Sequence, residues 1–234
     1  MGINRKLISP VQFIIYYSIM KTKLVILALL SAFSINVSAK SAANGQLSVG
    51  YTTESYFRGS QISEAAIELQ VGANGAIGGL DLFADVLSVQ SDDGANTDFA
   101  TLGLGKQIND LVTVYGGVIN INSEGASSQL DAFISLNFDA LLSPSVSVYR
   151  DTDDSVYTYE ASVSKSFDVG FAELDLGGSL GSTDVAGGER HYGGVTAQLK
   201  KKIDNVCLHA GVSLIDVEDL DVDTVVSAGV TFKF

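Results

Sequence analysis

The chain ends in the sequence VVSAGVTFKF (residues 225–234), in which apolar residues alternate with polar or small ones. Counting back from Phe234 in steps of two separates the two series, Phe232, Val230, Ala228 and Val226 against Lys233, Thr231, Gly229 and Ser227. Successive side chains of a β-strand point to opposite faces of its sheet. The alternation therefore predicts a final strand with one apolar face and one polar face.

A strand ending of this kind recurs about every thirty residues. An Ile or Phe followed by small or turn-forming residues marks each recurrence, at Ile77, Ile108, Phe138, Phe167 and Ile203, and the chain then ends at Phe234. The intervals are 31, 30, 29, 36 and 31 residues. This length suits a β-hairpin of two strands of about ten residues with one longer connection. Six hairpins predict twelve strands, and an even number brings both termini to the same end.

The two-residue alternation also runs back from the earlier marks. Behind Phe167, one face carries Val163 and Ala161, whereas the other carries serines and Glu160. The predicted strand from residue 111 to 120 is ambiguous. Two sets compete for its apolar face, Val112, Val114 and Val118 against Leu111, Tyr115 and Ile119.

Two all-β folds fit this pattern. A soluble sandwich would bury the apolar face, whereas an outer-membrane barrel turns that face to lipid and the polar face to its lumen. Barrels also alternate long external loops with short turns. The predicted long connections hold 15 of the 27 acidic residues and span 52–63, 88–98, 120–128, 150–155, 181–191 and 216–223. We therefore predict a transmembrane, antiparallel, up-and-down β-barrel of about twelve strands.

Residues near the tight turns support the membrane interpretation. Lys106, Lys165 and Lys201 fall on the apolar series, each two residues from a turn mark, where a Lys can reach the lipid headgroups. The terminal strand, with Phe232 and Phe234, resembles the signal by which outer-membrane barrels are recognised for assembly. We expect outer-membrane lipid and the barrel-assembly machinery as partners.

The N-terminal region does not fit the barrel pattern. Lys21 and Lys23 precede an apolar run that is followed by Val37-Ser38-Ala39, as in a cleaved secretory signal peptide. We predict an upstream extension over 1–19 from a mis-assigned start, a signal peptide over 20–39 and a barrel over 40–234. The alternative is a membrane anchor, but the lysines interrupt the apolar stretch before it reaches the roughly 20 residues that a spanning helix needs. The predicted location is the cell outer membrane.

Charge and cysteine content exclude some partners. Cleavage after Ala39 would keep all 27 acidic residues but only 10 of the 14 basic ones, a net charge of −17. Such a surface would repel nucleic acid. The single Cys207 cannot form an internal disulfide. The oligomeric state cannot be inferred from the sequence.

Charged residues on the polar faces predict what the lumen contains. The candidates are Glu68, Asp81, Asp85, Asp131, Glu160, Glu173, Asp175, Lys200 and Lys202, with Lys233 on the same face. An acidic, water-filled lumen would conduct small solutes and ions passively and weakly prefer cations. Alternatively, paired charges fill a narrow lumen, and we expect pairs between Glu173 or Asp175 and Lys200 or Lys202. A function of a different class is a non-conducting structural or surface-interaction barrel that acts through its acidic loops.

Three arginines fall in the predicted long loops, at Arg58, Arg150 and Arg190. Because Arg binds phosphate in bidentate geometry, they are candidates for contact with lipopolysaccharide. The acidic loops lack the glycine-containing spacing of a calcium loop, so we predict no metal site and no cofactor.

An enzyme is a third possibility. Outer-membrane hydrolases use a His oriented by other polar groups, and the chain has only His191 and His209. No Ser or carboxylate at a suggestive spacing accompanies either one. We therefore predict that the protein is not an enzyme.

The first long loop contains Tyr56-Phe57-Arg58-Gly59-Ser60-Gln61. This resembles the Tyr-x-Phe-Arg-Gly-x-Ser-Gln stretch near the mature start of TorF-type porins, a family of small proteobacterial outer-membrane proteins. Here Tyr and Phe are adjacent and Ser follows Gly directly. The resemblance covers about twenty residues, from Tyr51 to Gln70, and implies a porin-like role in the outer membrane without a known substrate.

Overall fold

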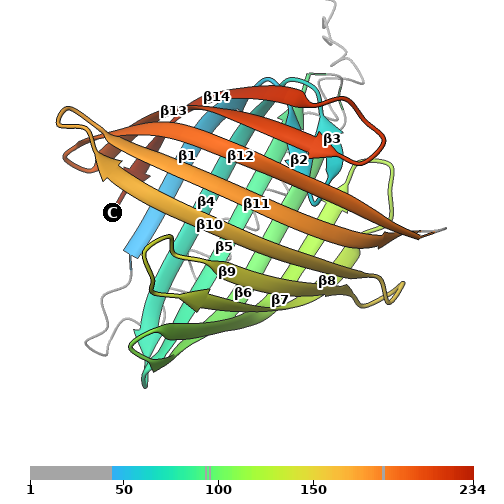
Figure 1. Cartoon of the computed structure of the whole chain (residues 1–234), viewed down its shortest axis with the longest axis horizontal. Helices are drawn as coiled ribbons and strands as arrows, with labels where there is room; N and C mark the ends of the chain where they lie inside the picture. Colours follow the sequence, from blue (N-terminus) through green and yellow to red (C-terminus); the bar gives the residue numbers. More distant parts are fainter. Residues whose placement is uncertain (1–43, 93, 95, 186–187) are drawn as a thin grey trace, which may run out of the picture. The chain divides into compact units, whose positions relative to one another are not determined.

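A closed β-barrel makes up the described part of the chain. The computed structural model describes residues 44–92, 94, 96–185 and 188–234. Twelve antiparallel strands close in the order β1-β14-β13-β12-β11-β10-β9-β8-β7-β6-β5-β4 (Figure 1). The predicted twelve-stranded barrel is confirmed. Among these residues, no helix has the length and apolar character of a membrane span. The predicted extension (1–19) and signal peptide (20–39) lie outside the described residues.

The strands vary in length from 3 to 16 residues. Their bounds are β1 Asn44–Thr52, β2 Ser55–Phe57, β3 Ser60–Ser63, β4 Ala66–Ile77, β5 Leu80–Ser91, β6 Asn96–Asn109, β7 Val112–Ser123, β8 Gln129–Phe138, β9 Ser145–Asp151, β10 Tyr157–Asp168, β11 Glu173–Val185, β12 Gly188–Ile203, β13 Val206–Val217 and β14 Asp223–Lys233. Strands β2 and β3 pair only with each other and form a separate hairpin.

The first and last barrel strands close the sheet. Strand β14 pairs with β1 from Gln46↔Lys233 to Thr52↔Ser227. Gly45 and Phe234 extend the seam by exchanging two backbone hydrogen bonds of 2.7 and 3.0 Å. Closure leaves no unpaired sheet edge, which hydrocarbon would not tolerate.

The two ends of the barrel differ. Both chain ends of the barrel, Asn44 and Lys233, lie with the connections 78–79, 110–111, 139–144, 169–172 and 204–205, here called the turn end. The opposite end, here called the loop end, carries the β2–β3 hairpin, the connections 124–128, 152–156 and 218–222, the end of β5 with the start of β6, and the end of β11 with the start of β12. The prediction that both termini share one end is confirmed.

The predicted loop lengths were partly wrong. Strands β5, β6, β11 and β12 continue through most of the segments 88–98 and 181–191. Beyond the membrane a hairpin is solvated on both faces, so paired strands can continue there without apolar alternation. At the turn end, the connection 139–144 is longer than a tight turn. Backbone groups of this connection make hydrogen bonds to neighbouring segments where strand pairing would otherwise continue. Asp139 N–H donates to Leu111 O, and Ser164 N–H donates to Leu142 O, both at 2.8 Å.

The apolar series points outward. Exposed fractions of 53% for Ile134, 70% for Leu180 and 57% for Val195 make a continuous apolar exterior that only a lipid environment accommodates. The ambiguous strand β7 is resolved, because Tyr115 packs inside against Phe83 while Val118 lies outside.

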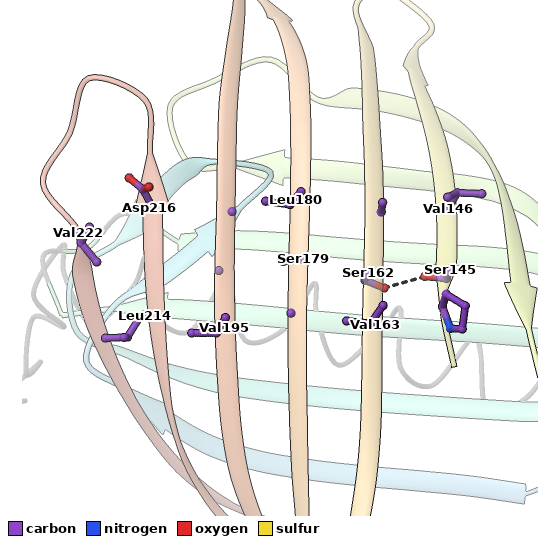
Figure 2. Close-up of a pocket in the computed structure, with 15 residues that line it drawn as sticks. Ser145, Val146, Ser162, Val163, Ser179, Leu180, Val195, Leu214, Asp216 and Val222 are labelled. Carbon is purple, nitrogen blue, oxygen red and sulfur yellow. Dashed lines mark hydrogen bonds between the residues drawn. The ribbon is translucent and has the colours of Figure 1, made fainter. Parts of the chain in front are cut away.

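A shallow apolar groove of about 610 Å³ crosses the outside of β9–β13. Figure 2 shows Val146, Val163, Leu180, Val195 and Leu214 around it, and a 2.7 Å hydrogen bond between Ser145 and Ser162. Small outward residues, Ala161, Gly178 and Gly193, form its floor. Its apolar lining on the lipid-facing wall suits acyl chains and not a polar solute.

Replacing Leu180 by Arg should lower the free energy of unfolding by about 2–4 kcal/mol, because the charge would lie in hydrocarbon near the middle of a strand. Ser179→Arg places the same charge on the inner face of the same strand and should cost much less. Urea unfolding in lipid vesicles, followed by the gel mobility of unboiled samples, compares the variants. Equal losses would contradict the assignment of the two faces.

Candidate functional site

The inner face gathers the predicted charged residues. One internal cavity is lined by Glu68, Glu173, Lys200, Lys202 and Lys233. The strand register places five more residues on the same inner face, namely Asp81, Asp85, Asp131, Glu160 and Asp175. All ten residues therefore lie on the inner face, and the chemistry of the site is that of the lumen.

The β2–β3 hairpin folds inside the barrel at the loop end. The Phe57 ring lies 4.7 Å from the Phe99 ring, measured between centroids. Phe57 and Ile62 pack against a buried cluster on the inside of the wall, made of Ala66, Val89, Phe99 and Ile121. Burial of this apolar face holds the hairpin against β4–β7.

The tip of the hairpin reaches the opposite wall. Arg58 forms an ion pair with Asp131, whose side chain is only 1% exposed. The Arg58 guanidinium lies between the rings of Phe57 and Tyr149, at 4.4 and 3.8 Å from their centroids. Gln129 donates a 2.8 Å hydrogen bond to the other carboxylate oxygen of Asp131. Cation–π contacts and a second hydrogen bond help to offset the cost of burying this pair.

The hairpin turn requires its local sequence. Arg58 and Gly59 are its two central residues, with φ values of 50° and 73°. Positive φ at both positions is the type I′ geometry that suits a two-residue hairpin. A Cβ on Gly59 would lie 2.7 Å from the Tyr192 ring, so glycine is needed for both conformation and space.

Polar contacts hold the base of the hairpin. Tyr56 donates to Asp223 on β14 and to Glu54 at 3.0 Å, while Ser55 donates to Glu68 at 3.3 Å. Burial raises the pKa of the Tyr56 phenol above its ordinary value, and the two carboxylates raise it further. Tyr56 therefore stays a neutral donor at physiological pH.

The arginine prediction needs correction. Arg58 lies in the lumen with a side chain only 9% exposed, and is not available to lipopolysaccharide. Arg190 donates to Ser60 of the hairpin at 3.5 Å and is also directed inward. Arg150 alone lies outside, 5.8 Å from the Tyr157 ring, so lipopolysaccharide contact stays a prediction for Arg150.

A polar chamber lies on the turn side of the hairpin. Its central cavity measures about 370 Å³, and a second cavity of about 630 Å³ reaches the turn end. Lys233 and Gln46 line both cavities. The predicted pairing between β11 and β12 is present as the Lys200–Asp175 ion pair.

Glycines opposite rings shape the inner wall, a feature that sequence reasoning missed. Five inward glycines each pair with an inward ring on the neighbouring strand: Gly103 with Phe83, Gly105 with Tyr115, Gly117 with Phe133, Gly181 with Tyr192 and Gly229 with His209. A Cβ on Gly181 would lie 2.2 Å from the Tyr192 ring. The rings can therefore lie flat along the wall instead of standing into the lumen. The sequence signals these glycine–ring pairs only through its 24 glycines. Which glycine lies opposite which ring depends on the strand register.

The two histidines lie on opposite faces of the barrel wall. By the strand register, His209 faces inward beside Lys200, while His191 faces outward. Among the described residues, no group of three or more His, Cys, Asp or Glu is placed to hold a metal ion. The geometry of the lumen is suited to the passage or binding of polar solutes.

Comparison with known proteins places the fold among outer-membrane channels. No protein-family model and no curated protein matches the sequence, so the TorF-type resemblance is not confirmed. Among solved structures, the KdgM porin has a TM-score of 0.56 at 11% identity, with 81% of this chain and 99% of that chain covered. The NanC porin has a TM-score of 0.55 at 12% identity, over 80% and 100%. The COG4313 outer membrane channel from Pseudomonas putida F1 has a TM-score of 0.52 at 10% identity, over 83% and 95%. These likenesses show a shared fold.

Replacing Gly181 by Val should lift the Tyr192 ring off the wall and break its 2.6 Å hydrogen bond to Glu160. We expect lower conductance through the barrel and a stability loss of about 1–3 kcal/mol, as for overpacking. The matched control is Gly178→Val, where an added Cβ meets only ordinary contacts of 3.8–4.0 Å on the outer face. Similar effects of the two variants in bilayer recordings and urea unfolding would contradict this role of Gly181.

Proposed function

We propose that the protein is an outer-membrane channel for the passive diffusion of small solutes, narrowed at its loop end by the β2–β3 hairpin. The observation that carries this proposal is a polar cavity of about 370 Å³ with a second cavity of about 630 Å³ and mixed lining next to it, in a barrel whose outside is apolar. The shared fold of the KdgM and NanC porins supports it.

The outer membrane is the site of action in this proposal. Phe232 points outward and is 42% exposed, and Phe234 is 68% exposed, so both are accessible as a recognition signal for the assembly machinery. Export depends on the predicted signal peptide. The turn end then faces the periplasm and the loop end faces the exterior, the arrangement common to such barrels.

The hairpin is the narrow part of the proposed path. It enters the lumen from the β1–β4 connection and reaches Asp131 and Tyr149 on the far wall. Atom Nη2 of Arg58 is buried without a hydrogen-bond partner among the described residues. An unsatisfied buried donor costs about 1–3 kcal/mol. The attachment of Arg58 is therefore weaker than it would be with every donor bonded.

The proposed ion preference is weakly cationic. Arg58 neutralises Asp131, and Asp175 neutralises Lys200. The carboxylates that remain from this set, Glu68, Asp81, Asp85, Glu160 and Glu173, outnumber the remaining cationic groups, Lys202, Lys233 and Arg190. Charges that line a water-filled path attract the opposite ion, so the excess favours cations.

A second candidate function is a non-conducting barrel that acts through its acidic loops. The observation that favours it is the packing of the hairpin across the loop end, with Phe57 partly buried and the Arg58 side chain buried against the wall. In this case solutes do not pass, and partners bind the external acidic hairpins.

Charge reversal at Glu160 tests conduction and selectivity together. Glu160→Lys should shift the reversal potential toward anions in planar bilayers under a salt gradient, because the residue faces the lumen. Asp131 is unsuitable for this test, since it holds Arg58. Asp153→Lys makes the same charge change in the exposed connection 152–156 and should leave the potential unchanged. An identical shift in both variants would count against a lumenal role for Glu160.

Removal of residues 55–63 tests the hairpin. Deletion should increase the single-channel conductance, because it empties the loop end of the lumen. Deletion of residues 219–221 in the connection between β13 and β14 removes a loop that no described contact places in the lumen, and should leave conductance unchanged. Heat-dependent gel mobility confirms that each barrel has closed. Folded barrels without current in either form would favour the non-conducting alternative.

A further inference from the structure

We propose that the chamber on the turn side of the hairpin is a binding site for small zwitterionic solutes, with an anionic group held by Lys202 and Lys233 and a cationic group held by Glu68 and Asp85. The inference deepens the proposed channel function by naming the class of solute, and it rests on that function.

Carboxylates and amines line the chamber from different strands, and Glu173 on β11 is the carboxylate that lies beside the amines, next to Lys200. Glu68 on β4 and Asp85 on β5 supply the carboxylates of the proposed site, while Lys202 on β12 and Lys233 on β14 supply its amines. Glu68 and both lysines line the central cavity, and Asp85 and Lys233 line the cavity next to it. A solute in either cavity therefore meets a carboxylate and an amine together.

These four groups are not consumed by internal ion pairs. Within the described residues the ion pairs of the barrel are Arg58–Asp131 and Lys200–Asp175. Glu68 accepts one hydrogen bond from Ser55 and Asp85 accepts one from Gln70, both from neutral donors. A carboxylate has about four acceptor sites and an ammonium has three donors, so each retains capacity for a solute.

Two glycines lie in the row of residues that the strand register pairs between Glu68 and Lys200. Glu68 pairs with Gly50, Gly50 with Gly229, and Gly229 with His209, which in turn pairs with Lys200. The two glycines add no side chain of their own to this row. His209 lies along the wall over Gly229, with Nε2 2.6 Å from where a Cβ of that glycine would be.

Size and neutral lining also suit a small polar molecule. The central cavity of about 370 Å³ falls within the roughly 300–1,000 Å³ of small-molecule sites. Gln46, Ser48, Gln70 and Thr231 add hydrogen-bonding groups that carry no charge. The hairpin contacts this lining through the hydrogen bond that Ser55 donates to Glu68.

Electrostatics favours a zwitterion over a simple ion. An anion near Lys202 would be attracted by that amine but repelled by Glu68, which lines the same cavity. A cation near Glu68 would be attracted by the carboxylate but repelled by Lys202. A zwitterion that is aligned with the field gains both attractions, and a neutral molecule of equal size gains neither.

Binding is tested on the refolded mature barrel in detergent, by calorimetric titration with 4-aminobutyrate and with the neutral 4-hydroxybutanamide. We expect the zwitterion to bind at least about tenfold more tightly, a difference of about 1.4 kcal/mol. The double variant Lys202→Gln/Lys233→Gln and the single variant Glu68→Gln should each remove this preference. Lys106→Gln, on the outer face, is the matched control and should keep it.

Current recordings on the same samples separate the two proposals. Preferential binding of the zwitterion that the lumenal variants abolish supports the zwitterion site, whether or not the barrel conducts. A barrel that shows this binding but no current would overturn the channel proposal alone. A conducting barrel that binds the two probes equally, or whose preference survives in the lumenal variants, would overturn the zwitterion site and leave the channel standing.

Discussion

Every other feature of this protein depends on the pairing of β14 with β1. A β-sheet in hydrocarbon cannot leave its edge groups unbonded, because each would lose several kcal/mol of hydrogen bonding to water. The last strand bonds the edge groups of the first through seven residue pairs. Two backbone hydrogen bonds between Gly45 and Phe234 extend this seam. Closure then divides the alternating side chains into an outside and an inside, and the inside becomes the site.

The interior is organised around a segment that takes no part in closure. The β2–β3 hairpin contributes no strand to the barrel, yet it contacts β6, β8 and β9 through Phe57 and Arg58. It divides the lumen into a packed loop end and a polar chamber at the turn end. Asp131 ties it to the far wall, which explains why this carboxylate near the loop end of β8 is fully buried.

Glycine has an unusual part in the wall. In most strands it weakens packing, but here five inward glycines lie opposite rings such as Tyr192 and Phe83. The rings cover the bare backbone and stay flat, so aromatic residues line the lumen without filling it. A barrel of twelve strands thus keeps cavities although large side chains point inward.

The sequence alone determined the strand number, the shared end of the barrel's two chain ends and the inward face of the ten charged residues of the barrel wall, because these follow from two-residue alternation and from local turn chemistry. It did not determine how far β5, β6, β11 and β12 extend beyond the membrane, since solvated hairpins need no alternation. Only the tertiary structure decided the position of Arg58. Its partner Asp131 is 73 residues away, and nothing local distinguishes a loop that folds inward from one that lies outside. Register likewise decided which glycine lies under which ring and which charges face each other, because contacts across a barrel join residues that are distant in the chain.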